Sequence, residues 1–312
     1  MSAYIVRRLW QMIPTMLGVI LLVFVLFNWV GGDPAYVLAG KISNQEQIDN
    51  IRRQLGVDQP AWVQLWIFIK QVLTGDFGAS WSTNEKVGQI LATRLGPSLT
   101  VLLPLLVIET VIAIGLALAV AYVRGSLSAH AVMILCTVGL SISILVYIIV
   151  FQYFFAYKLG WFPVQGWGNS LPENLFVYSS LPILIGLVVS IAPNLRLYRT
   201  FFLDEINQDY VRTARAKGLS ENRIMWIHVL RNASIPIITH LMAGLPALLI
   251  GAFLIERFFS IPGIGREVIL AVERSDFPVI KAITVYVAFA TMLTNLLADL
   301  MYKAVDPRVQ LQ

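Results

Sequence analysis

The sequence is poor in charge and rich in apolar residues. Only 13% of its 312 residues are charged, whereas 57% are hydrophobic, and the mean hydropathy is +0.73. This composition excludes an ordinary soluble globular domain and predicts an integral membrane protein. The formal net charge of +5 does not indicate a nucleic-acid-binding protein, because the basic residues lie beside long apolar segments, where membrane topology explains them.

The residues and motifs of most catalytic and metal sites are also scarce. The single cysteine, Cys136, rules out an intrachain disulfide and a cysteine metal cluster, and the histidines His130, His228 and His240 lack the spacing of metal ligands. No G-x-x-x-x-G-K-[ST], H-E-x-x-H or G-x-S-x-G motif is present, so the chain has no visible ATP site. We expect no catalytic residue and no metal, with a membrane enzyme built from dispersed residues as the alternative.

Six apolar segments are each long enough to cross a hydrocarbon core of roughly 30 Å as a helix. They lie near residues 9–30, 98–123, 130–157, 179–196, 235–255 and 279–301. No small-x-small cleavage site follows the first segment, so we interpret it as a retained anchor rather than a signal peptide. The sequence therefore predicts an all-α integral membrane protein with six transmembrane helices.

The basic residues indicate how the chain is oriented. Lysines and arginines near span ends stay on the cytoplasmic side, and they concentrate before the first span, after the second, after the fourth and after the sixth. Both termini are therefore predicted to be cytoplasmic. The chain then divides into a cytoplasmic segment with the first span (1–30), an external loop domain (31–97), and a five-helix core (98–312) that carries a cytoplasmic hairpin at about 197–234.

The external loop has the pattern of a folded segment. Ser43 and Glu46 form a capping box, a stripe of apolar residues follows, and Gly56 ends the predicted helix. A second helix is predicted from Pro60 to about Gly75. We expect this loop to be a compact cap over the mouth of the bundle, with direct substrate capture as the alternative.

Glu109 lies near the middle of the second span, where an ionisable side chain is costly unless it is paired, protonated or facing water. It is either a residue that lines a polar pathway or a carboxyl hydrogen-bonded within the bundle. His240, Asn295 and Asp299 raise the same question. No constellation typical of a proton or sodium relay is present, which disfavours a secondary transporter without excluding it.

The stretch QDYVRTARAKGLS (208–220) concentrates cations in a cytoplasmic segment with the pattern helix, break, helix. Asp209 is predicted to cap a helix that runs through Lys217, Gly218 to end it in the left-handed conformation, and Ser220 to begin a second helix leading into the fifth span. Positive-inside topology and anionic lipid headgroups explain the sign of the charges, but not this patterning. We interpret the first helix as a docking element; its residues are Asp209, Tyr210, Arg212, Thr213, Ala214, Arg215, Ala216, Lys217, Gly218 and Leu219.

The segment DYVRTARAKGLSENRIMWIHVLRNASIP resembles the cytoplasmic coupling loop of permease subunits in bacterial peptide ABC importers, the oligopeptide, dipeptide and nickel group. Gly218 matches the general loop pattern of these importers, whereas Arg212, Thr213, His228 and Arg231 depart from it in the manner of the peptide branch. Further motifs of this family occur in the right order: GDPA (32–35), LGVDQP (55–60), GDFGAS (75–80), IPGIG (261–265), SDFP (275–278) and VDPR (305–308).

This resemblance implies a type I ABC importer permease of the bacterial inner membrane, of the first-permease type with a long external loop after span one. It implies a second homologous permease, two cytoplasmic ATPases that bind ATP and Mg, an external substrate-binding protein, and surrounding membrane lipid as partners. The chain itself is expected to bind no cofactor. The substrates implied are di- or oligopeptides; a nickel chelate or another small solute, or a stand-alone secondary transporter, are the alternatives.

Overall fold

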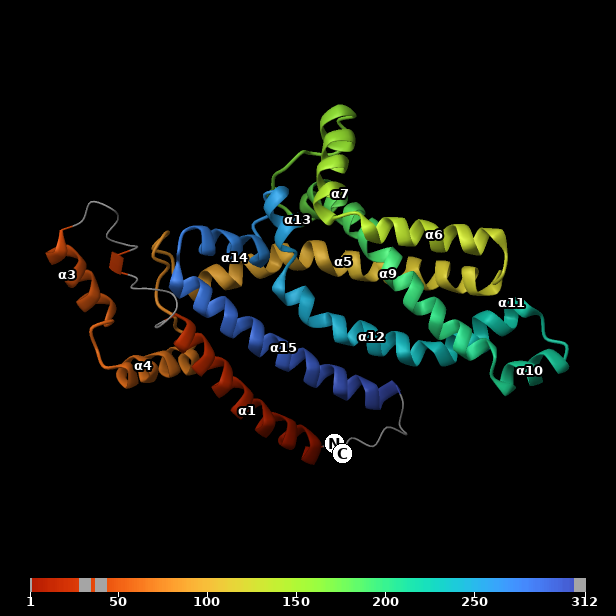
Figure 1. The fold of residues 1–312 in the computed structure, drawn as a ribbon, viewed down its shortest axis with the longest axis horizontal. Coiled ribbons are helices and arrows are strands. Elements are labelled where there is room, and N and C mark those ends of the chain that lie inside the picture. The colour runs from red at the N-terminus through yellow and green to blue at the C-terminus, as the bar shows by residue number, and fades with distance from the viewer. Residues whose placement is uncertain (1, 28–34, 37–43, 306–312) are drawn as a thin grey trace.

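The computed structural model describes residues 2–27, 35–36 and 44–305. Within these residues the regular structure is helical, apart from one isolated bridge between Ala79 and Lys86. Figure 1 shows long helices running roughly along one axis of the molecule, with α3 (Gln45–Leu55) and α4 (Ala61–Thr74) at one end and α10 (Asp209–Ala216) at the other. The predicted all-α membrane architecture is thus confirmed in outline.

Five helices in the described part of the chain are long and apolar enough to cross a membrane, and the number is six if one bent pair counts as a single span. The long helices are α1 (Ser2–Val25), α5 (Val87–Tyr122), α9 (Ser180–Ile206), α12 (Leu230–Ile250) and α15 (Phe277–Val305). Short helices connect them: α8 (Leu171–Glu173), π-helix η3 (Asn174–Tyr178), α11 (Glu221–Arg223), π-helix η4 (Ile224–Val229), α13 (Phe253–Phe258) and α14 (Ile264–Glu273).

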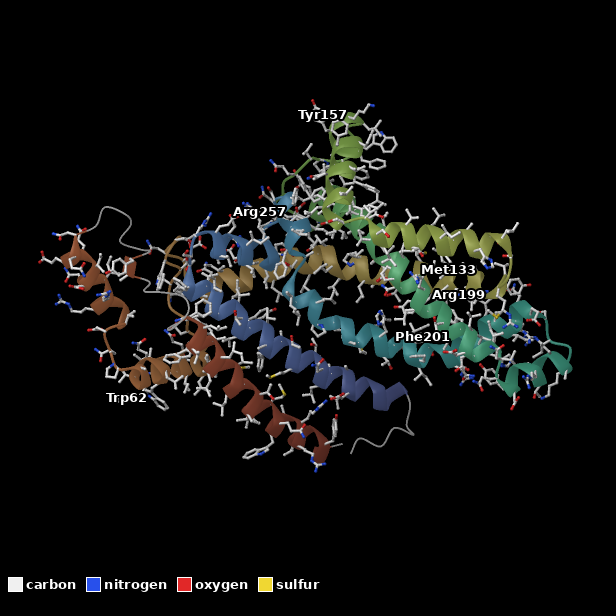
Figure 2. All side chains as sticks on the ribbon, viewed as in Figure 1. Trp62, Met133, Tyr157, Arg199, Phe201 and Arg257 are labelled. Atoms are coloured by element: carbon white, nitrogen blue, oxygen red, sulfur yellow. The ribbon has the colours of Figure 1, made fainter. Side chains whose placement is uncertain are left out.

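The third predicted span, 130–157, is not one continuous helix. It divides into α6 (Leu127–Ser141) and α7 (Ile144–Phe151), which continues as the π-helix η2 (Gln152–Lys158), and the two halves are bent by 93°. Ile142 is extended at the break, and the Ser143 side chain accepts a hydrogen bond from the Leu145 amide, which caps α7. As a result α7 and η2 stand away from the long axis, with Tyr157 near the tip (Figures 1 and 2).

The helices α3 and α4 correspond to the two helices predicted between the first and second spans. Gly56 and Gly75 end α3 and α4 in the left-handed conformation, with φ of 67° and 69°. Asn44 occupies the N-cap position of α3 without a side-chain cap bond, and Ser43 of the predicted capping box lies outside the described residues. α5 begins at Val87, inside the segment predicted as loop. Residues 32–34 of GDPA and residues 306–308 of VDPR also lie outside the described residues.

The α4 helix lies against the membrane part of the chain. Phe68 is buried in a cluster with Ile20, Val23 and Phe24 of α1 and Val285 of α15. The tryptophans Trp62 and Trp66 of α4 are 73% and 66% exposed, and Figure 2 shows Trp62 pointing away from the bundle. Such exposure suits an aromatic belt at the membrane interface.

The centre of the bundle is the pair α5 and α9, which pack along one another. The small residues Ala113, Ala117 and Ala121 of α5 are buried here, which lets the helix backbones approach closely. The same apolar cluster includes the buried Cys136 of α6 and continues through Tyr198 and Phe202 of α9 into the hairpin that follows α9.

The first and last helices contact each other through charge. Asp299 of α15 accepts hydrogen bonds from the Tyr4 hydroxyl at 2.9 Å and from Arg8 Nε at 2.8 Å, both on α1. Asp299 was one of the polar residues that the sequence placed in a span without a partner. Its partners are on another helix, so the ion pair fixes α1 against α15 rather than lining a relay.

Candidate functional site

The predicted hairpin is present between α9 and α12, with a small shift at its start. Gln208 occupies the N-cap position of α10, where its side chain makes no cap bond, and Asp209 is the first helical residue. The expectation that Asp209 caps the helix is therefore wrong by one position. A carboxylate in the first turn still interacts favourably with the positive end of the helix dipole.

The end of α10 follows the prediction. The helix stops at Ala216, Lys217 occupies the C-cap position, and Gly218 has a φ of 77°. The Gly218 amide donates to the Arg215 carbonyl at 2.9 Å, and the Leu219 amide donates to the Ala214 carbonyl at 3.3 Å. Because Gly218 lacks a Cβ, it adopts this left-handed conformation without strain and reverses the chain toward α11.

The helix α10 has one face on the bundle and one face in solvent. Val211 and Ala214 are buried in the central apolar cluster, and Tyr210 and Leu219 pack against it. The solvent-facing residues of α10 and the turn after it are Asp209, Arg212, Thr213, Arg215, Ala216, Lys217 and Gly218. Ala214 was predicted to help a partner approach, but it is 6% exposed and serves packing instead. The surface open to a partner is therefore made by Thr213, Ala216 and the cations around them.

The three cations of α10 are not equivalent. Arg215 donates to the Glu221 carboxylate of α11 from Nε at 2.6 Å and from its second guanidinium nitrogen at 3.1 Å. These hydrogen bonds hold the pKa of Glu221 below its ordinary value. Both side chains are more than a third exposed, so the pair contributes little to stability. Arg212 forms only a long contact of 3.4 Å with Asp209 and, like Lys217, is exposed.

Tyr210 fastens the hairpin to the end of α9. Its hydroxyl donates to Glu205 at 2.7 Å. Burial, the largest cause, raises the pKa of Tyr210 to about 12. The hydroxyl therefore keeps its proton at neutral pH and remains a hydrogen-bond donor.

The second half of the hairpin continues without a break into a membrane helix. α11, η4 and α12 follow one another from Glu221 to Ile250, with Ile224, Met225 and Val229 buried. The predicted passage from the hairpin into the fifth span is thus confirmed. The helix α10 and the start of this segment also share the central apolar cluster, through Val211 and Met225.

Glu109 is buried within the bundle of this chain. It accepts a hydrogen bond from Asn194 Nδ2 of α9, and Asn194 Oδ1 lies 3.0 Å from His240 Nε2 of α12. Of the two interpretations of Glu109, the geometry fits the carboxyl that is hydrogen-bonded in the bundle. A role for Glu109 in lining the pathway stays a prediction. Sequence reasoning missed Asn194, although an asparagine in an apolar span is itself a signal.

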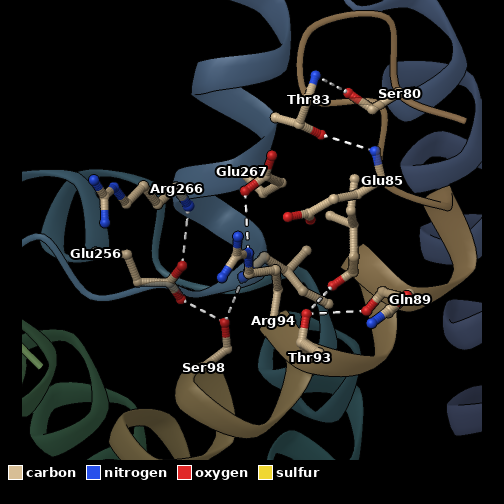
Figure 3. Close-up of polar contacts among 12 residues, drawn as sticks. Ser80, Thr83, Glu85, Gln89, Thr93, Arg94, Ser98, Glu256, Arg266 and Glu267 are labelled. Carbon is tan, nitrogen blue, oxygen red and sulfur yellow. Dashed lines mark hydrogen bonds and ion pairs between the residues drawn. The ribbon is translucent and has the colours of Figure 1, made fainter. Parts of the chain in front are cut away.

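Sequence reasoning also missed a second polar site. It lies near the first part of α5, away from the hairpin. Glu256 of α13 is fully buried and accepts hydrogen bonds from Ser98 Oγ at 2.8 Å, Ala252 N at 3.0 Å and Arg266 N at 3.0 Å. Figure 3 shows Ser98 and Arg266 meeting this carboxylate from two sides. A Cβ at Gly263 would lie 2.3 Å from the carboxylate, which explains one glycine of the IPGIG motif. We call Glu256 and its donors the outer carboxylate site.

Two further motifs of the sequence contact each other nearby. Asp276, from SDFP, accepts hydrogen bonds from the Ser80 hydroxyl at 2.5 Å, the Trp81 amide at 3.1 Å and the Ser82 hydroxyl at 2.8 Å. Ser80 is the last residue of GDFGAS. The motifs therefore have a structural reason, since they attach the segment before α5 to the start of α15.

The described residues contain no group of three or more histidine, cysteine, aspartate or glutamate side chains that could hold a metal ion. The site residues that the structure does bring together are those of the hairpin. They form a solvent-facing, mainly cationic surface on α10. A turn at Gly218 connects this short helix to the helical segment that ends in α12.

Comparison with known proteins agrees with this architecture. Residues 87–311 match the family described as "Binding-protein-dependent transport system inner membrane component", and residues 1–103 match its N-terminal membrane component. The chain is 34% identical to a probable peptide ABC transporter permease protein of Sinorhizobium fredii, over 99% of this chain and 100% of that protein. It is 33% identical to the glutathione transport system permease protein GsiC of Salmonella choleraesuis, over 99% of each chain.

A putative peptide transport system permease protein of Brucella abortus is 35% identical, again over 99% of each chain. These similarities extend over α3 and α4, the bundle and the hairpin alike. The chain therefore belongs to the family of binding-protein-dependent transport system inner membrane components.

Proposed function

We propose that this chain is the first of two permease subunits in an ABC importer that takes up di- or oligopeptides. The observation that carries the proposal is the hairpin, in which a turn at Gly218 joins the exposed cationic helix α10 to α11, and α11 continues through η4 into α12. Relatives that match nearly the whole chain are named as permeases for peptides and for glutathione, itself a small peptide. The hairpin and the named relatives both favour a transport subunit that is driven by separate ATPase subunits.

The partners follow from this role. Two cytoplasmic ATPases supply ATP, Mg and hydrolysis, and one of them docks on the face of α10 that carries Thr213 and Ala216. A second homologous permease completes the pathway, and an external binding protein delivers the peptide. An acidic rim on the ATPase would pair with Arg212 and Lys217, whose charges are the least engaged on this helix.

The proposed orientation places the hairpin in the cytoplasm of a bacterium and α3 and α4 outside its inner membrane. In Figure 1, α1 runs away from the hairpin end of the bundle and α15 runs back toward it. This course supports cytoplasmic termini. The exposed tryptophans of α4 would then lie at the outer membrane interface, and the external loop would cover the mouth of the bundle.

The proposed mechanism is a mechanical one. Closure of the two ATPases would displace α10, and the continuous segment α11, η4 and α12 would carry that displacement into the membrane. Because α12 contacts both α5 and α9, its movement would change the packing between helices. Switching between inward-facing and outward-facing packing is an established type of transition.

The decisive experiment compares the purified chain alone with the complete complex in lipid vesicles. Alone, the chain is expected to hydrolyse no ATP and to move no peptide. With the second permease, the ATPases and the binding protein, we expect ATP-dependent accumulation of labelled peptide. Uptake by the chain alone, driven by an ion gradient, would contradict the proposal and favour a secondary transporter. Accumulation of a nickel chelate but not of peptide would overturn the proposed substrate.

A tryptophan at Ala216 tests the docking face. Ala216 is exposed, so Ala216→Trp is expected to leave the chain folded but to reduce co-purification of the ATPase by more than about tenfold, because the bulky ring blocks close approach. Glu221→Gln, which also alters the exposed part of the hairpin, serves as the matched control and should retain the ATPase. Normal ATPase binding by Ala216→Trp would show that α10 docks by another face.

A further inference from the structure

Three polar side chains meet inside the bundle where α5, α9 and α12 pack together. Glu109 comes from α5, Asn194 from α9 and His240 from α12, and we call them the polar triad. Asn194 bonds to both of the others, to Glu109 through Nδ2 and to His240 through Oδ1, the latter at 3.0 Å. Glu109 is 5% exposed, and the Tyr198 ring stacks edge-on against His240 with centroids 5.7 Å apart.

The geometry fixes the direction of each hydrogen bond in the polar triad. Because the Glu109 carboxylate accepts from Nδ2 of Asn194, the amide oxygen faces His240 and has to accept as well. Nε2 of His240 therefore carries a hydrogen. The side chain of Asn194 is the link, since neither Glu109 nor His240 contacts the other in this arrangement.

The position of the polar triad relates it to the hairpin. His240 lies on the helix that continues directly from the hairpin, whereas Glu109 and Asn194 lie on the two helices that form the centre of the bundle. Tyr198, beside His240, belongs to the same apolar cluster as Val211 of α10 and Met225 of η4. Any displacement of α12 relative to α5 and α9 therefore stretches the bond to His240, which is lost beyond roughly 3.5 Å.

We propose that the polar triad is a latch that holds α12 against α5 and α9 in this conformation and opens when the hairpin is displaced. Asn194 is the positioning residue, because its two hydrogen bonds set the relation between the moving helix and the fixed pair. This inference rests on the proposed function. It explains why three polar groups are retained in an apolar bundle where leucines would pack more cheaply.

The latch predicts a specific fault when it is removed. Two interhelical hydrogen bonds of the strength found between membrane helices correspond to roughly tenfold in an equilibrium constant. Without them α12 separates more easily, so the complex should hydrolyse ATP about tenfold faster in the absence of binding protein. The amount of peptide taken up per ATP should fall by a similar factor.

The test uses paired variants in the complete complex, reconstituted in vesicles. Glu109→Leu and His240→Leu remove an acceptor and a donor, whereas Glu109→Gln and His240→Gln retain a polar atom of the same kind at similar reach. Leucine variants are expected to be uncoupled and glutamine variants to resemble the natural chain. Thr200→Val is the control, because Thr200 is exposed on α9 and its hydroxyl bonds only within its own helix, to the Arg196 carbonyl.

A second variant separates the latch from a purely structural anchor. Asn194→Ala breaks both hydrogen bonds without adding bulk and should give the same uncoupling as the leucine variants. If Asn194→Ala and the leucine variants lose hydrolysis and uptake in equal proportion, or keep the natural ratio of uptake to hydrolysis, the latch is refuted. Failure of the natural complex to transport peptide would instead refute the proposed function, so the two outcomes are distinguishable.

Discussion

Replacing Gly218 with proline is expected to abolish ATP-dependent uptake while leaving the chain in the membrane. Gly218 has a φ of 77°, whereas proline fixes φ near −65°, and proline also removes the amide that donates to the Arg215 carbonyl at 2.9 Å. The end of α10 would then unwind, and a displacement of α10 by the ATPase would no longer reach α12. We expect at least about tenfold less peptide uptake, since the combined cost is roughly 3 kcal/mol at the joint itself.

The matched control for this change is Gly218→Asn. Asparagine tolerates the left-handed conformation better than other residues with a side chain, and the space around Gly218 is open, with no atom within 4 Å of an added Cβ. Gly218→Asn should therefore retain most of the uptake. Equal activity of Gly218→Pro and the natural chain, measured with the complete complex in vesicles, would show that the turn is not needed for coupling.

Glu256→Leu is expected to have the largest effect on the stability of the chain itself. The carboxylate is fully buried and satisfies Ser98, Ala252 and Arg266 at once. Leucine would leave the buried Ser98 hydroxyl and the half-buried amides of Ala252 and Arg266 without this acceptor, and an unsatisfied buried donor costs about 1–3 kcal/mol. The chain should lose more than about 3 kcal/mol of stability in total, which is seen as a large drop in the temperature of unfolding in detergent or as failure to accumulate.

Two other variants distinguish the effect of the buried Glu256 carboxylate from the effects of neighbouring polar groups. Glu267→Gln alters a neighbouring carboxylate whose contact with Arg94 is a single one of 3.3 Å, so it should cost less than about 1 kcal/mol. Ser98→Ala should fall between the two, because the Ser98 hydroxyl donates to Glu256 and also accepts from the Ile264 amide at 2.9 Å. Unfolding temperatures that do not follow this order would contradict the structural role of Glu256.

The local features of the fold could be predicted because their causes lie close together in the sequence. Helices α3, α4 and α10 each stop at a glycine in the left-handed conformation, and a glycine after an amphipathic stretch predicts that stop. The start of α10 was misplaced by one residue because Gln208 and Asp209 are both compatible with a helix start. Such boundaries are fixed by backbone dihedrals rather than by residue type alone.

The break in the third span had no such signal. Both α6 and α7 are apolar. The length and hydropathy of 130–157 therefore fit one straight span and two bent helices equally well. The bend is braced by the Tyr147 hydroxyl, which donates to the Gly139 carbonyl at 3.0 Å. Ser126 and Ser143 cap the two helices, and Tyr147 joins them across the bend. These roles are recognised only once the course of the backbone is known.

The polar sites could be predicted only in part from the sequence. A charged residue in an apolar segment is easily recognised, but its hydrogen-bond partners are not. Glu109 was singled out for its position in a span, while Asn194, 85 positions away, supplies the hydrogen bond. Glu256 was not singled out in the sequence, although it is buried and accepts a hydrogen bond from Ser98, 158 positions away. Pairing over such separations is decided by packing, which a single sequence does not encode locally.

The buried position of Cys136 in the central apolar cluster has a practical consequence. It is the one thiol of the chain, and it is only 6% exposed, so water-soluble maleimide reagents are expected to spare it in the folded protein. The natural sequence is thereby already a suitable background for site-specific labelling. A cysteine placed at the exposed Thr200 or Trp62 would carry a fluorophore or spin label alone, and would report motion in a working transporter without further mutation.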